Sequence, residues 1–574
     1  MTAPDLACPK QTRCPGCPLG AAPYEAGLAE KGAVLAAALD AYPNLQPELL
    51  PPRPATPTHE YRLRAKLVSH GRALGLYERG SHSVLDVTGC RVLSPALTRT
   101  SEALRRLLPL PLHGADLRET SEGVLVTLLT DRVQARQVLQ AAAASLVEQG
   151  DAFSVAIAVR RDGDVRLLSG EPEVVVGAAA AKHRLSPGAP YAYAAHGGFV
   201  QAHAGQAGYV YAELARGLRE RLGAERSPTV LELFAGNGSL ALGLAQGGAE
   251  VTAVEAYAPA IRLAERAARE QGLSLRAVAS DATVFVQREA KARYDAVLVN
   301  PPRRGLSAEL RRALGGLGPR ALGYVSCNPH TLARDAQHLQ RLGLRLSRAE
   351  PLDMIPWSDA LEALAWFVPQ APPAPRVLFE DDQYLAVDKE AHEILGQATL
   401  DSLTARVLRL PGCERAQALD GWGNAVSGVT WFAKSAAAAP QSAWLGERTL
   451  LVLARGSLRK QGTVTRRANA TTTRGSRYKK QADVGRHALV SVINEDADEA
   501  GTLRDFASIG HPVLGDAVTG DAASNQFLEH RHGLDRAFVH CEQSRLRAPD
   551  GVERVAHSQL APDLNRVLTS LGSD

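Results

Sequence analysis

The chain has 574 residues, of which 45% are hydrophobic and 22% charged, and its 65 lysines and arginines against 61 acidic residues give a formal net charge of only +4. This composition predicts three or four globular domains at roughly 150 residues each, and it excludes a global electrostatic attraction to nucleic acid, so any such binding must come from local patches. No apolar run approaches the roughly 18 residues of a membrane helix, and the first residues lack the basic and apolar regions of a signal peptide, so we expect a cytoplasmic protein with no membrane partner.

Three of the seven cysteines lie close together near the start of the chain. Cys8, Cys14 and Cys17 form the pattern C-x5-C-x2-C, and Cys90 follows at a distance. So few cysteines in so long a chain exclude a disulfide framework, whereas four thiolates suit zinc or an iron–sulfur cluster. Zinc sites usually combine two short C-x2-4-C motifs, so a triplet with one distant cysteine favours the iron–sulfur cluster. Taken alone, Cys90 could equally be a buried thiol that binds no metal. We expect residues 1–95 to be a metal-binding region.

The next stretch, residues 96–198, shows only ordinary secondary-structure patterns. Helical stretches at 98–108 and 131–149 alternate with strand-like runs at 123–129 and 154–159. The alternation predicts an α/β insert. It carries no motif that indicates chemistry.

A strand, a glycine turn and two further strand ends form the next pattern. The apolar run Thr229–Leu233 leads into Gly236 and Gly238 before a new helix, where glycines let a ligand approach the backbone. Glu255 ends a second strand and suits a ribose diol, and Asp281 follows a possible third strand. A lone G-x-G is weak, but this spacing and the missing third glycine fit S-adenosylmethionine better than a dinucleotide.

Two later strands each end in a turn with a reactive or polar side chain. The run 294–299 reaches Asn300 and two prolines, and the run 321–326 reaches Cys327, followed by Asn-Pro and a helical stretch. Open α/β sheets bind ligands at the carboxyl ends of their strands, so we expect Asn300 and Cys327 at one edge. The alternatives are a simple loop at Asn300 and a small buried core thiol at Cys327.

Together these motifs resemble the RNA uracil-C5 methyltransferases of the iron–sulfur type, over about residues 8 to 367. The resemblance rests on the cysteine pattern, Phe199 and Gln201, Leu231-Glu-Leu-Phe-Ala-Gly-Asn-Gly238, Asn300-Pro-Pro-Arg-Arg-Gly305, Ser326-Cys-Asn-Pro-His-Thr-Leu-Ala-Arg-Asp335, and Asp353-Met-Ile-Pro356 with Glu362. It implies a Rossmann-like methyltransferase domain over 199–370, a [4Fe-4S] cluster on the four cysteines, Cys327 as nucleophile and Glu362 as general base. The residues expected to bind S-adenosylmethionine are Gln201, Phe234, Gly236, Gly238, Glu255, Asp281 and Asn300.

Methylation of uracil needs both residue types that the resemblance implies. Uracil C5 is too weak a nucleophile to take a methyl group until a thiolate adds at C6, which would be the role of Cys327. A carboxylate must then remove the C5 proton, and this would be Glu362, although by sequence alone Glu362 reads as a solvated helix residue. The chain departs from the family where Asn300 replaces an Asp, where His203 replaces an Asn, and where Trp357-Ser-Asp-Ala360 replaces a Gln-Thr-x-His run.

A proline-rich segment at 371–375 predicts a domain boundary. The domain beyond it, 376–574, resembles the RluA-like pseudouridine synthases over about residues 376 to 550. The strand pair at 377–389 and the Gly510-His-Pro512 block carry this resemblance. We therefore expect an α+β domain after the α/β methyltransferase domain.

The catalytic motif of this second family is altered. Its catalytic carboxylate would be Asp420, but two extra residues separate Asp420 from Ser427, and without a gap the catalytic position falls on Gly423. The second family block, at 498–504, also departs from the pattern. Two independent changes in one site predict lost catalysis, and the alternative is a working pseudouridine synthase site that uses Asp420 with Tyr478.

A basic stretch in the same domain predicts contact with RNA. Residues 455–486 hold ten lysines or arginines against a single acid. This suits phosphate contacts by Arg474, Arg477 and Lys479 with Tyr478 as a stacking platform, and the alternative is a solvated loop.

The sequence favours an S-adenosylmethionine-dependent enzyme that forms 5-methyluridine in rRNA or tRNA, with a C-terminal domain that binds RNA. RNA is the expected partner, and no obligate protein partner is evident. The alternatives are an enzyme with both activities and a binding protein in which both halves are degenerate. Retention of Cys327 and Glu362 argues against the last.

Overall fold

The computed structural model divides into two compact units. It describes all residues except 1–5, 133–134, 161–169, 224–226, 397–401, 436–444, 468–472, 495–498, 549 and 574, and it does not describe the side chains of 465–467, 473–474 and 494. Unit 1 comprises Met1–Pro302, Leu317–Leu332 and Leu346–Pro369. Unit 2 comprises Arg303–Gly316, Ala333–Arg345 and Gln370–Asp574.

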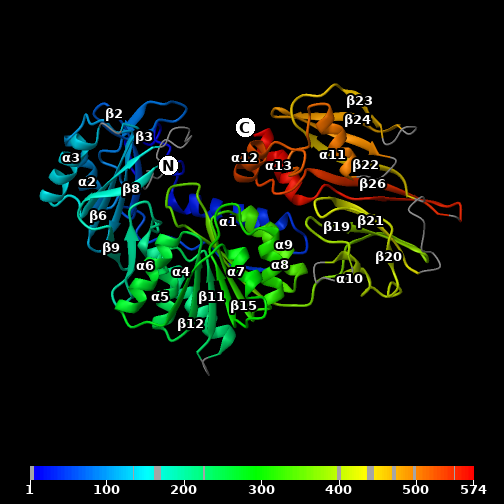
Figure 1. Cartoon of the computed structure of the whole chain (residues 1–574), viewed down its shortest axis with the longest axis horizontal. Coiled ribbons are helices and arrows are strands. Elements are labelled where there is room, and N and C mark those ends of the chain that lie inside the picture. Colours follow the sequence, from blue (N-terminus) through cyan, green and yellow to red (C-terminus); the bar gives the residue numbers. More distant parts are fainter. Residues whose placement is uncertain are drawn as a thin grey trace. The chain divides into compact units, whose positions relative to one another are not determined.

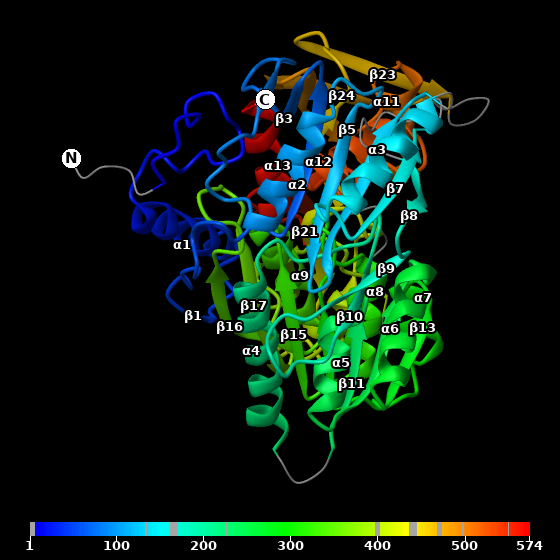
Figure 2. The ribbon, with the colours of Figure 1, turned by 90° about the vertical axis from the view of Figure 1, so that its left-hand side faces the viewer.

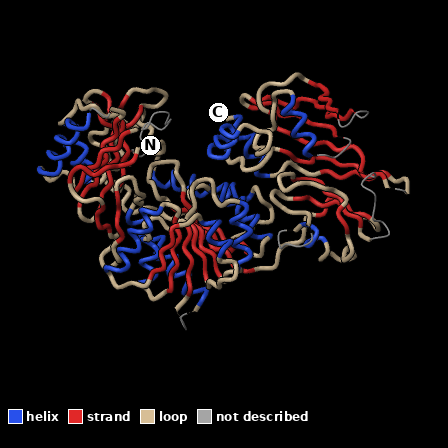
Figure 3. The backbone as a smooth tube through the Cα atoms, viewed as in Figure 1, coloured by secondary structure: helices blue, strands red, loops and turns tan. Residues whose placement is uncertain are grey.

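An eight-stranded sheet forms the centre of unit 1, with the strand order β1-β16-β17-β15-β14-β11-β12-β13 (Figures 1 and 3). Its strands are β1 (Glu48–Leu49), β11 (Thr229–Leu233), β12 (Glu250–Glu255), β13 (Leu275–Ala279), β14 (Ala296–Val299), β15 (Ala321–Ser326), β16 (Leu344–Leu352) and β17 (Glu362–Pro369). Strands β11 to β15 pair in parallel, and β17 runs antiparallel to β15. Strands β14 and β15 are buried along their whole length, as expected of parallel strands covered on both faces.

Helices alternate with these strands and contribute apolar side chains to the core. They are α4 (Ala204–Leu222), α5 (Ser239–Gln246), α6 (Ala258–Glu270) and α7 (Ala282–Arg288). Leu214 of α4 and Leu240 of α5 join Val230 and Leu298 from the sheet in one apolar cluster. The alternation confirms the α/β part of the predicted fold.

A second sheet in unit 1 has seven strands in the order β4-β3-β2-β5-β6-β7-β8. Its elements are β2 (Arg64–His70), β3 (Ala73–Tyr77), β4 (Val84–Asp86), β5 (Gly114–Thr120), β6 (Gly123–Thr130), β7 (Ser154–Val159) and β8 (Glu171–Val176), with α2 (Pro95–Arg106) and α3 (Arg136–Glu148) packed against it (Figure 2). Strand β2 pairs with β5, so the sheet contains strands from both sides of residue 95. The predicted boundary between 1–95 and 96–198 therefore lies inside one sheet, because the sequence pattern shows strands but not their pairing partners. Helix α1 (Tyr24–Asp40) and the β9–β10 pair (Ala180–His183, Ala192–Ala195) complete this part of the chain.

Unit 2 contains a ten-stranded sheet that follows the path β18-β19-β21-β26-β22-β25-β24-β23, with β20 paired to β21 and β27 to β26. Its strands are β18 (Val377–Glu380), β19 (Tyr384–Lys389), β20 (Gln417–Ala418), β21 (Ser427–Ala433), β22 (Leu445–Ala454), β23 (Gln461–Arg467), β24 (Thr473–Val484), β25 (His487–Asn494), β26 (Val539–Arg547) and β27 (Glu553–His557). Its helices include α10 (Leu403–Val407), α11 (Glu499–Ser508), α12 (Ala522–His532) and α13 (Pro562–Gly572). Trp431 and Phe506 are fully buried in its core.

Unit 2 also takes two segments from the predicted methyltransferase domain. Helix α8 (Ala308–Leu317) lies almost entirely in unit 2, and α9 (Pro329–Arg341) enters unit 2 at Ala333. The predicted domain 199–370 is therefore not one compact unit. The physical reason is a buried set of ion pairs described below, which joins these helices to residues beyond 370 and which local sequence patterns do not reveal. Across the part of the chain that the structure describes, no helix is both long and apolar enough to span a membrane.

Candidate active site

The carboxyl ends of β11, β14 and β15 meet at one edge of the eight-stranded sheet, because these strands are parallel neighbours. A cavity of about 640 Å³, counting the part open to solvent, lies in unit 1 at this edge. Its lining includes Gln201, Phe234, Gly236, Asn300 and Glu362. The structure thus brings together five residues that the sequence predicts for one site. Gly238, Glu255, Asp281 and Cys327 are not among the lining residues.

The two glycines of the turn after β11 have different structural roles. Gly238 has φ of +73°, and a Cβ there would lie 2.6 Å from the Cβ of Ala264, so Gly238 lets α5 pack closely on α6. Gly236 has φ of +57°, and no atom lies within 4 Å of where its Cβ would be. Its N–H donates to Oε2 of Glu255 at 3.0 Å, which ties the turn to the end of β12. The open space at Gly236 suits the close approach of a ligand.

Asp281 and His203 have local structural roles. Asp281 is the N-cap of α7, where its side chain accepts from the N–H groups of Thr283 and Val284. His203 is the N-cap of α4 and stacks on Tyr61, with ring centroids 4.9 Å apart. His203 thus replaces the family's Asn at a position where either residue can cap a helix.

Glu362 is the first residue of β17, so the expectation of a solvated helix residue is wrong. The short Ala-Leu-Glu-Ala-Leu pattern suits a helix locally, but pairing with β15 decides the conformation. Burial raises the pKa of Glu362 to about 7. A general base works best with a pKa near the operating pH, so this carboxylate is suited to proton removal.

The β15–β17 ladder ends beside both Cys327 and Glu362 in the chain. Its last pair is Ser326 with Ala363, and Cys327 directly follows Ser326 while Glu362 directly precedes Ala363. The turn after Cys327 is held by Asn328, whose N–H donates to Oγ of Ser326 and whose Oδ1 accepts from the N–H of His330.

Two titratable residues of the cavity were not among those predicted. Glu232 is buried on β11, its Oε2 has no hydrogen-bond partner among the described residues, and burial raises its pKa to about 8. Tyr211 on α4 bonds with Gln201, and burial, with Glu232 and Glu362 nearby, raises its pKa well above the ordinary value. The signal available in the sequence was a single acid inside the apolar run Thr229–Leu233. A buried polar atom without a partner marks the place where a bound ligand can supply one.

Known proteins resemble this chain over most of its first two thirds. Residues 214–313 match the family model described as "Methyltransferase small domain". The 23S rRNA (uracil(1939)-C(5))-methyltransferase RlmD of Pseudomonas fluorescens is 32% identical over 375 residues, which cover 63% of this chain and 80% of the relative. The chain belongs to the RNA uracil-C5 methyltransferase family.

Two further proteins resemble part of the chain. The 23S rRNA (uracil(747)-C(5))-methyltransferase RlmC of Shewanella oneidensis is 38% identical over 162 residues, 28% of this chain and 42% of the relative. The crystal structure of Pyrococcus abyssi tRNA (uracil-54, C5)-methyltransferase with S-adenosyl-L-homocysteine has a TM-score of 0.50 at 23% identity, and the match covers 62% of this chain and 86% of that one. This likeness shows a shared fold. The predicted class, an S-adenosylmethionine-dependent RNA uracil-C5 methyltransferase, is confirmed.

The four N-terminal cysteines of this methyltransferase are free thiols that lie near one another. Burial, and then Cys90, Cys14 and Cys8, raise the pKa of Cys17 to about 12. Among the residues described, no three or more His, Cys, Asp or Glu side chains gather as ligands of one metal ion. In a [4Fe-4S] cluster each thiolate binds a different iron, so the four sulfurs need not converge on one point. Four cysteine thiolates are the donor set that such a cluster takes.

Trp357, one of the departures from the family pattern, packs against the cysteine loop. Its ring lies in a buried cluster with Leu6 and Tyr61, against which Cys8 and Cys17 also pack. Its indole N–H donates to the carbonyl of Thr58 at 2.8 Å. Trp357 therefore helps to pack the N-terminal region, in the place where the family has its Gln-Thr-x-His run.

The predicted pseudouridine synthase residues of unit 2 lie in its interior. Asp420 is buried, pairs with Arg448 at 2.7 Å and accepts from the N–H of Trp431 at 2.5 Å. Gly423 donates its N–H to Oε2 of Glu499, and a Cβ at Gly423 would lie 2.6 Å from that oxygen. The carboxylate of Glu499 thus fills the space that a side chain at 423 would need.

The basic stretch presents different residues on the two faces of β24. Arg477 and Lys479 are exposed, whereas Tyr478 between them is buried, with its ring 5.7 Å from that of Phe506. Tyr478 therefore lies in the core and not beside the cations as a stacking surface, because side chains alternate along a strand. The side chain of Arg474 lies outside the described residues.

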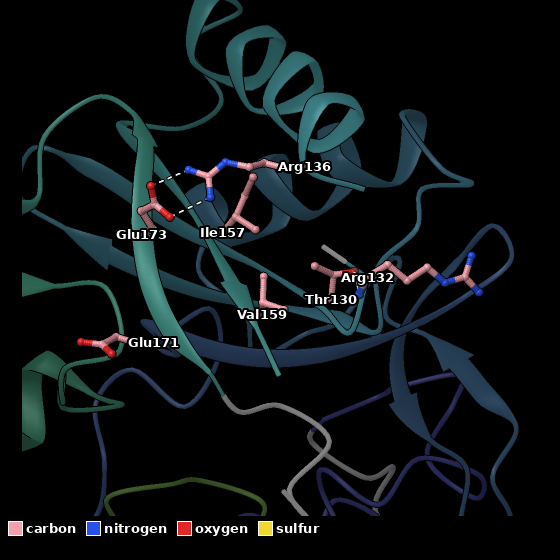
Figure 4. Close-up of a pocket in the computed structure, with 7 residues that line it drawn as sticks. All are labelled: Thr130, Arg132, Arg136, Ile157, Val159, Glu171 and Glu173. Atoms are coloured by element: carbon pink, nitrogen blue, oxygen red, sulfur yellow. Dashed lines mark hydrogen bonds and ion pairs between the residues drawn. The ribbon is translucent and has the colours of Figure 1, made fainter. Parts of the chain in front are cut away.

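A second cavity lies at the edge of the seven-stranded sheet (Figure 4). Ile157 and Val159 line it, and Arg136 and Glu173 form an exposed ion pair beside it. None of the predicted site residues lies there. We assign it no chemistry.

Proposed function

We propose that this chain forms 5-methyluridine in ribosomal RNA, with Cys327 as nucleophile and Glu362 as general base. The observation that carries the proposal is the end of the β15–β17 ladder at the Ser326–Ala363 pair, where Cys327 and Glu362 are the next residues of the two segments. The raised pKa of Glu362 supports it, because a base with a pKa of about 7 can accept a proton near neutral pH. Ribosomal RNA is chosen because the relatives RlmD and RlmC are named for 23S rRNA.

In this mechanism the thiolate of Cys327 adds to C6 of uracil, and electrons move through C5–C6 to give an enolate. S-adenosylmethionine supplies the methyl group that C5 then takes. Glu362 removes the C5 proton, and the C6–S bond breaks to release Cys327. Gln201, Phe234 and Gly236 would hold the cofactor in the cavity, with the orphaned Oε2 of Glu232 available to its polar groups.

Two variants test the assignment of Cys327 and Glu362. Cys327→Ala should abolish methylation while RNA and cofactor binding persist, because only the addition step is removed. Glu362→Gln should accumulate a covalent RNA–protein adduct on a denaturing gel, because addition and methyl transfer proceed but proton removal stalls. The assay uses unmodified 23S rRNA transcript and S-adenosylmethionine. A Glu362→Gln protein with no shifted band, where wild type methylates, contradicts the role of Glu362.

We further propose that Cys8, Cys14, Cys17 and Cys90 hold a structural [4Fe-4S] cluster, since four cysteines leave no iron open to substrate. Protein purified without oxygen should then be brown and contain about four irons per chain. Stoichiometric zinc would contradict this assignment.

For the C-terminal region we propose RNA binding without pseudouridine synthesis. The support is the burial of Asp420 against Arg448, which leaves its carboxylate engaged inside the core. Pseudouridine formation that disappears in Asp420→Asn would contradict the proposal.

A further inference from the structure

Two segments of the methyltransferase sequence continue directly from candidate site residues into unit 2. Pro302, two residues after Asn300, is followed by the segment Arg303–Gly316. Leu332, five residues after Cys327, is followed by Ala333–Arg345. The chain therefore connects both candidate site turns to structure that unit 2 holds in place.

A buried carboxylate joins these two segments to each other. Asp335 is fully buried and accepts from the N–H of Leu306 at 2.7 Å and from the guanidinium of Arg311 at 2.5 Å. Arg334 bonds to the same carboxylate and also donates to the carbonyl of Arg304 at 2.8 Å. The backbone N–H of Leu306 and the carbonyl of Arg304 thus both bind α9, which fixes the loop that begins at Arg303.

Asp535, in the C-terminal region, supplies a second carboxylate that balances the charges of Arg334 and Arg311. Oδ2 of Asp535 lies 3.0 Å from Arg334 and 3.6 Å from Arg311, and 3.3 Å from the Nε2 of His392. Two buried guanidinium groups are therefore matched by two carboxylates, one on α9 and one from residue 535. Although burial opposes ionisation, Arg334, His392 and Arg311 hold the pKa of Asp535 well below its ordinary value.

The loop that carries His392 is held by the same helices. Arg312 donates to the carbonyl of His392 at 3.0 Å, and Arg341 binds the carboxylate of Glu390 at 2.7 Å and the carbonyl of Ala391 at 3.0 Å. Four arginines of α8 and α9 therefore face the C-terminal region. When every charge in such a buried polar network has a partner, the network holds its side chains in one geometry.

We infer that Asp535 is a positioning residue for RNA methylation, because it holds Arg334 and Arg311 and, through them and Asp335, the segments that continue from Asn300 and Cys327. The inference rests on the proposed function. It gives the C-terminal region a role in the chemical step that is separate from RNA binding. A shift of about 1 Å in a reacting group can reduce a rate by roughly a hundredfold, so the effect should appear in kcat.

Asp535→Asn tests this, because it keeps the shape of the side chain and removes its charge. We expect kcat to fall at least about tenfold, with KM for 23S rRNA and Kd for S-adenosylmethionine within about twofold of wild type. In a Glu362→Gln background the covalent adduct should form more slowly by the same factor. Asp535→Glu should recover part of the rate. The control is Asp382→Asn, which removes an exposed charge in unit 2 and should leave kcat unchanged.

A folded Asp535→Asn protein with wild-type kcat, or with a change in KM alone, overturns the inference. If Asp535→Asn does not fold, His392→Asn is the second variant, since His392 has φ of +59° and Asn tolerates that conformation. It should lower kcat about threefold or more, and an unchanged kcat overturns the inference. A wild-type protein that forms no 5-methyluridine overturns the proposed function first and this inference with it.

Discussion

Glu362 lets the pH dependence of the reaction be predicted from one side chain. Its pKa is raised to about 7 by burial, and only the ionised form can take the C5 proton. As pH falls through 7 the carboxylate becomes protonated, so kcat should fall about tenfold per pH unit below pH 6 and level off above pH 8. Steady-state rates of release of methylated RNA from pH 5 to 9 measure this, because proton removal follows methyl transfer. An inflection near pH 4.3, the ordinary value for Glu, would show that burial does not control this base.

Asn300 has a consequence for the choice of base. It lines the cavity that also contains Glu362, at the position where the family has a carboxylate. A carboxylate only accepts, which suits the N3–H of uracil, whereas an amide can also donate to N3 of cytosine. We expect Asn300→Asp to speed uracil methylation and to raise discrimination against cytosine by roughly 1 to 2 kcal/mol.

The measurement for Asn300 is kcat/KM on matched short RNAs that differ only in the target base. Asn300→Ala is the control, because it removes both hydrogen-bonding groups and should slow methylation without favouring uracil. If Asn300→Asp leaves the ratio of the two kcat/KM values unchanged, Asn300 shapes the Pro-Pro turn and does not read the base.

At the scale of elements, β24 presents a testable surface. Arg477 and Lys479 are exposed on the same face of this strand. Changing both to Gln should weaken RNA binding and flatten the slope of log affinity against log salt by roughly 0.7 to 0.9 for each phosphate that the protein no longer neutralises. Filter binding at several salt concentrations gives the slope. Lys480→Gln is the control, since Asp483 neutralises Lys480 at 2.9 Å, closer than the 3.7 Å between Arg477 and Glu447, and an equal effect there would argue against a specific surface.

Elements that depend on short-range patterns were predictable, and those that depend on distant partners were not. The strands ending at Leu233, Val299 and Ser326 follow from apolar runs that stop at glycine, proline or asparagine. Glu362 was misjudged because its strand forms only by pairing with β15, which a local pattern does not contain. For the same reason the sequence indicated the strands around residue 95 but not that they share a sheet. The basic stretch indicated Arg477 and Lys479 as RNA contacts, yet it did not show that Tyr478 lies on the opposite face of β24.

At the scale of the whole molecule, the methyltransferase segment should not fold correctly by itself. A fragment of residues 1–370 keeps Arg311 and Arg334 but lacks Asp535, and it leaves Arg341 without Glu390. Breaking one buried ion pair costs about 3 to 5 kcal/mol, which approaches the whole stability of many domains. We expect the fragment to be insoluble or to unfold well below the full chain.

Soluble yield and thermal unfolding followed by circular dichroism test the 1–370 fragment against the full chain. Co-expression with residues 371–574 is the control, because a separate C-terminal chain can still supply Asp535 and Glu390. A stable, monomeric fragment that binds S-adenosylmethionine as the full chain does would show that the ion pairs are dispensable.

The discontinuity of unit 2 also bears on synthesis at the ribosome. Arg334 is made roughly 200 residues before its partner Asp535. At about 5 to 20 residues per second, the nascent chain carries α8 and α9 for roughly 10 to 40 seconds before that carboxylate exists. During this interval Asp335 can already hold the loop after Asn300, but Arg334 and Arg311 lack the second carboxylate that balances their charge. A chain that stalls before residue 535 would therefore lack the positioning contact, so full catalytic rate is available only once translation is almost complete.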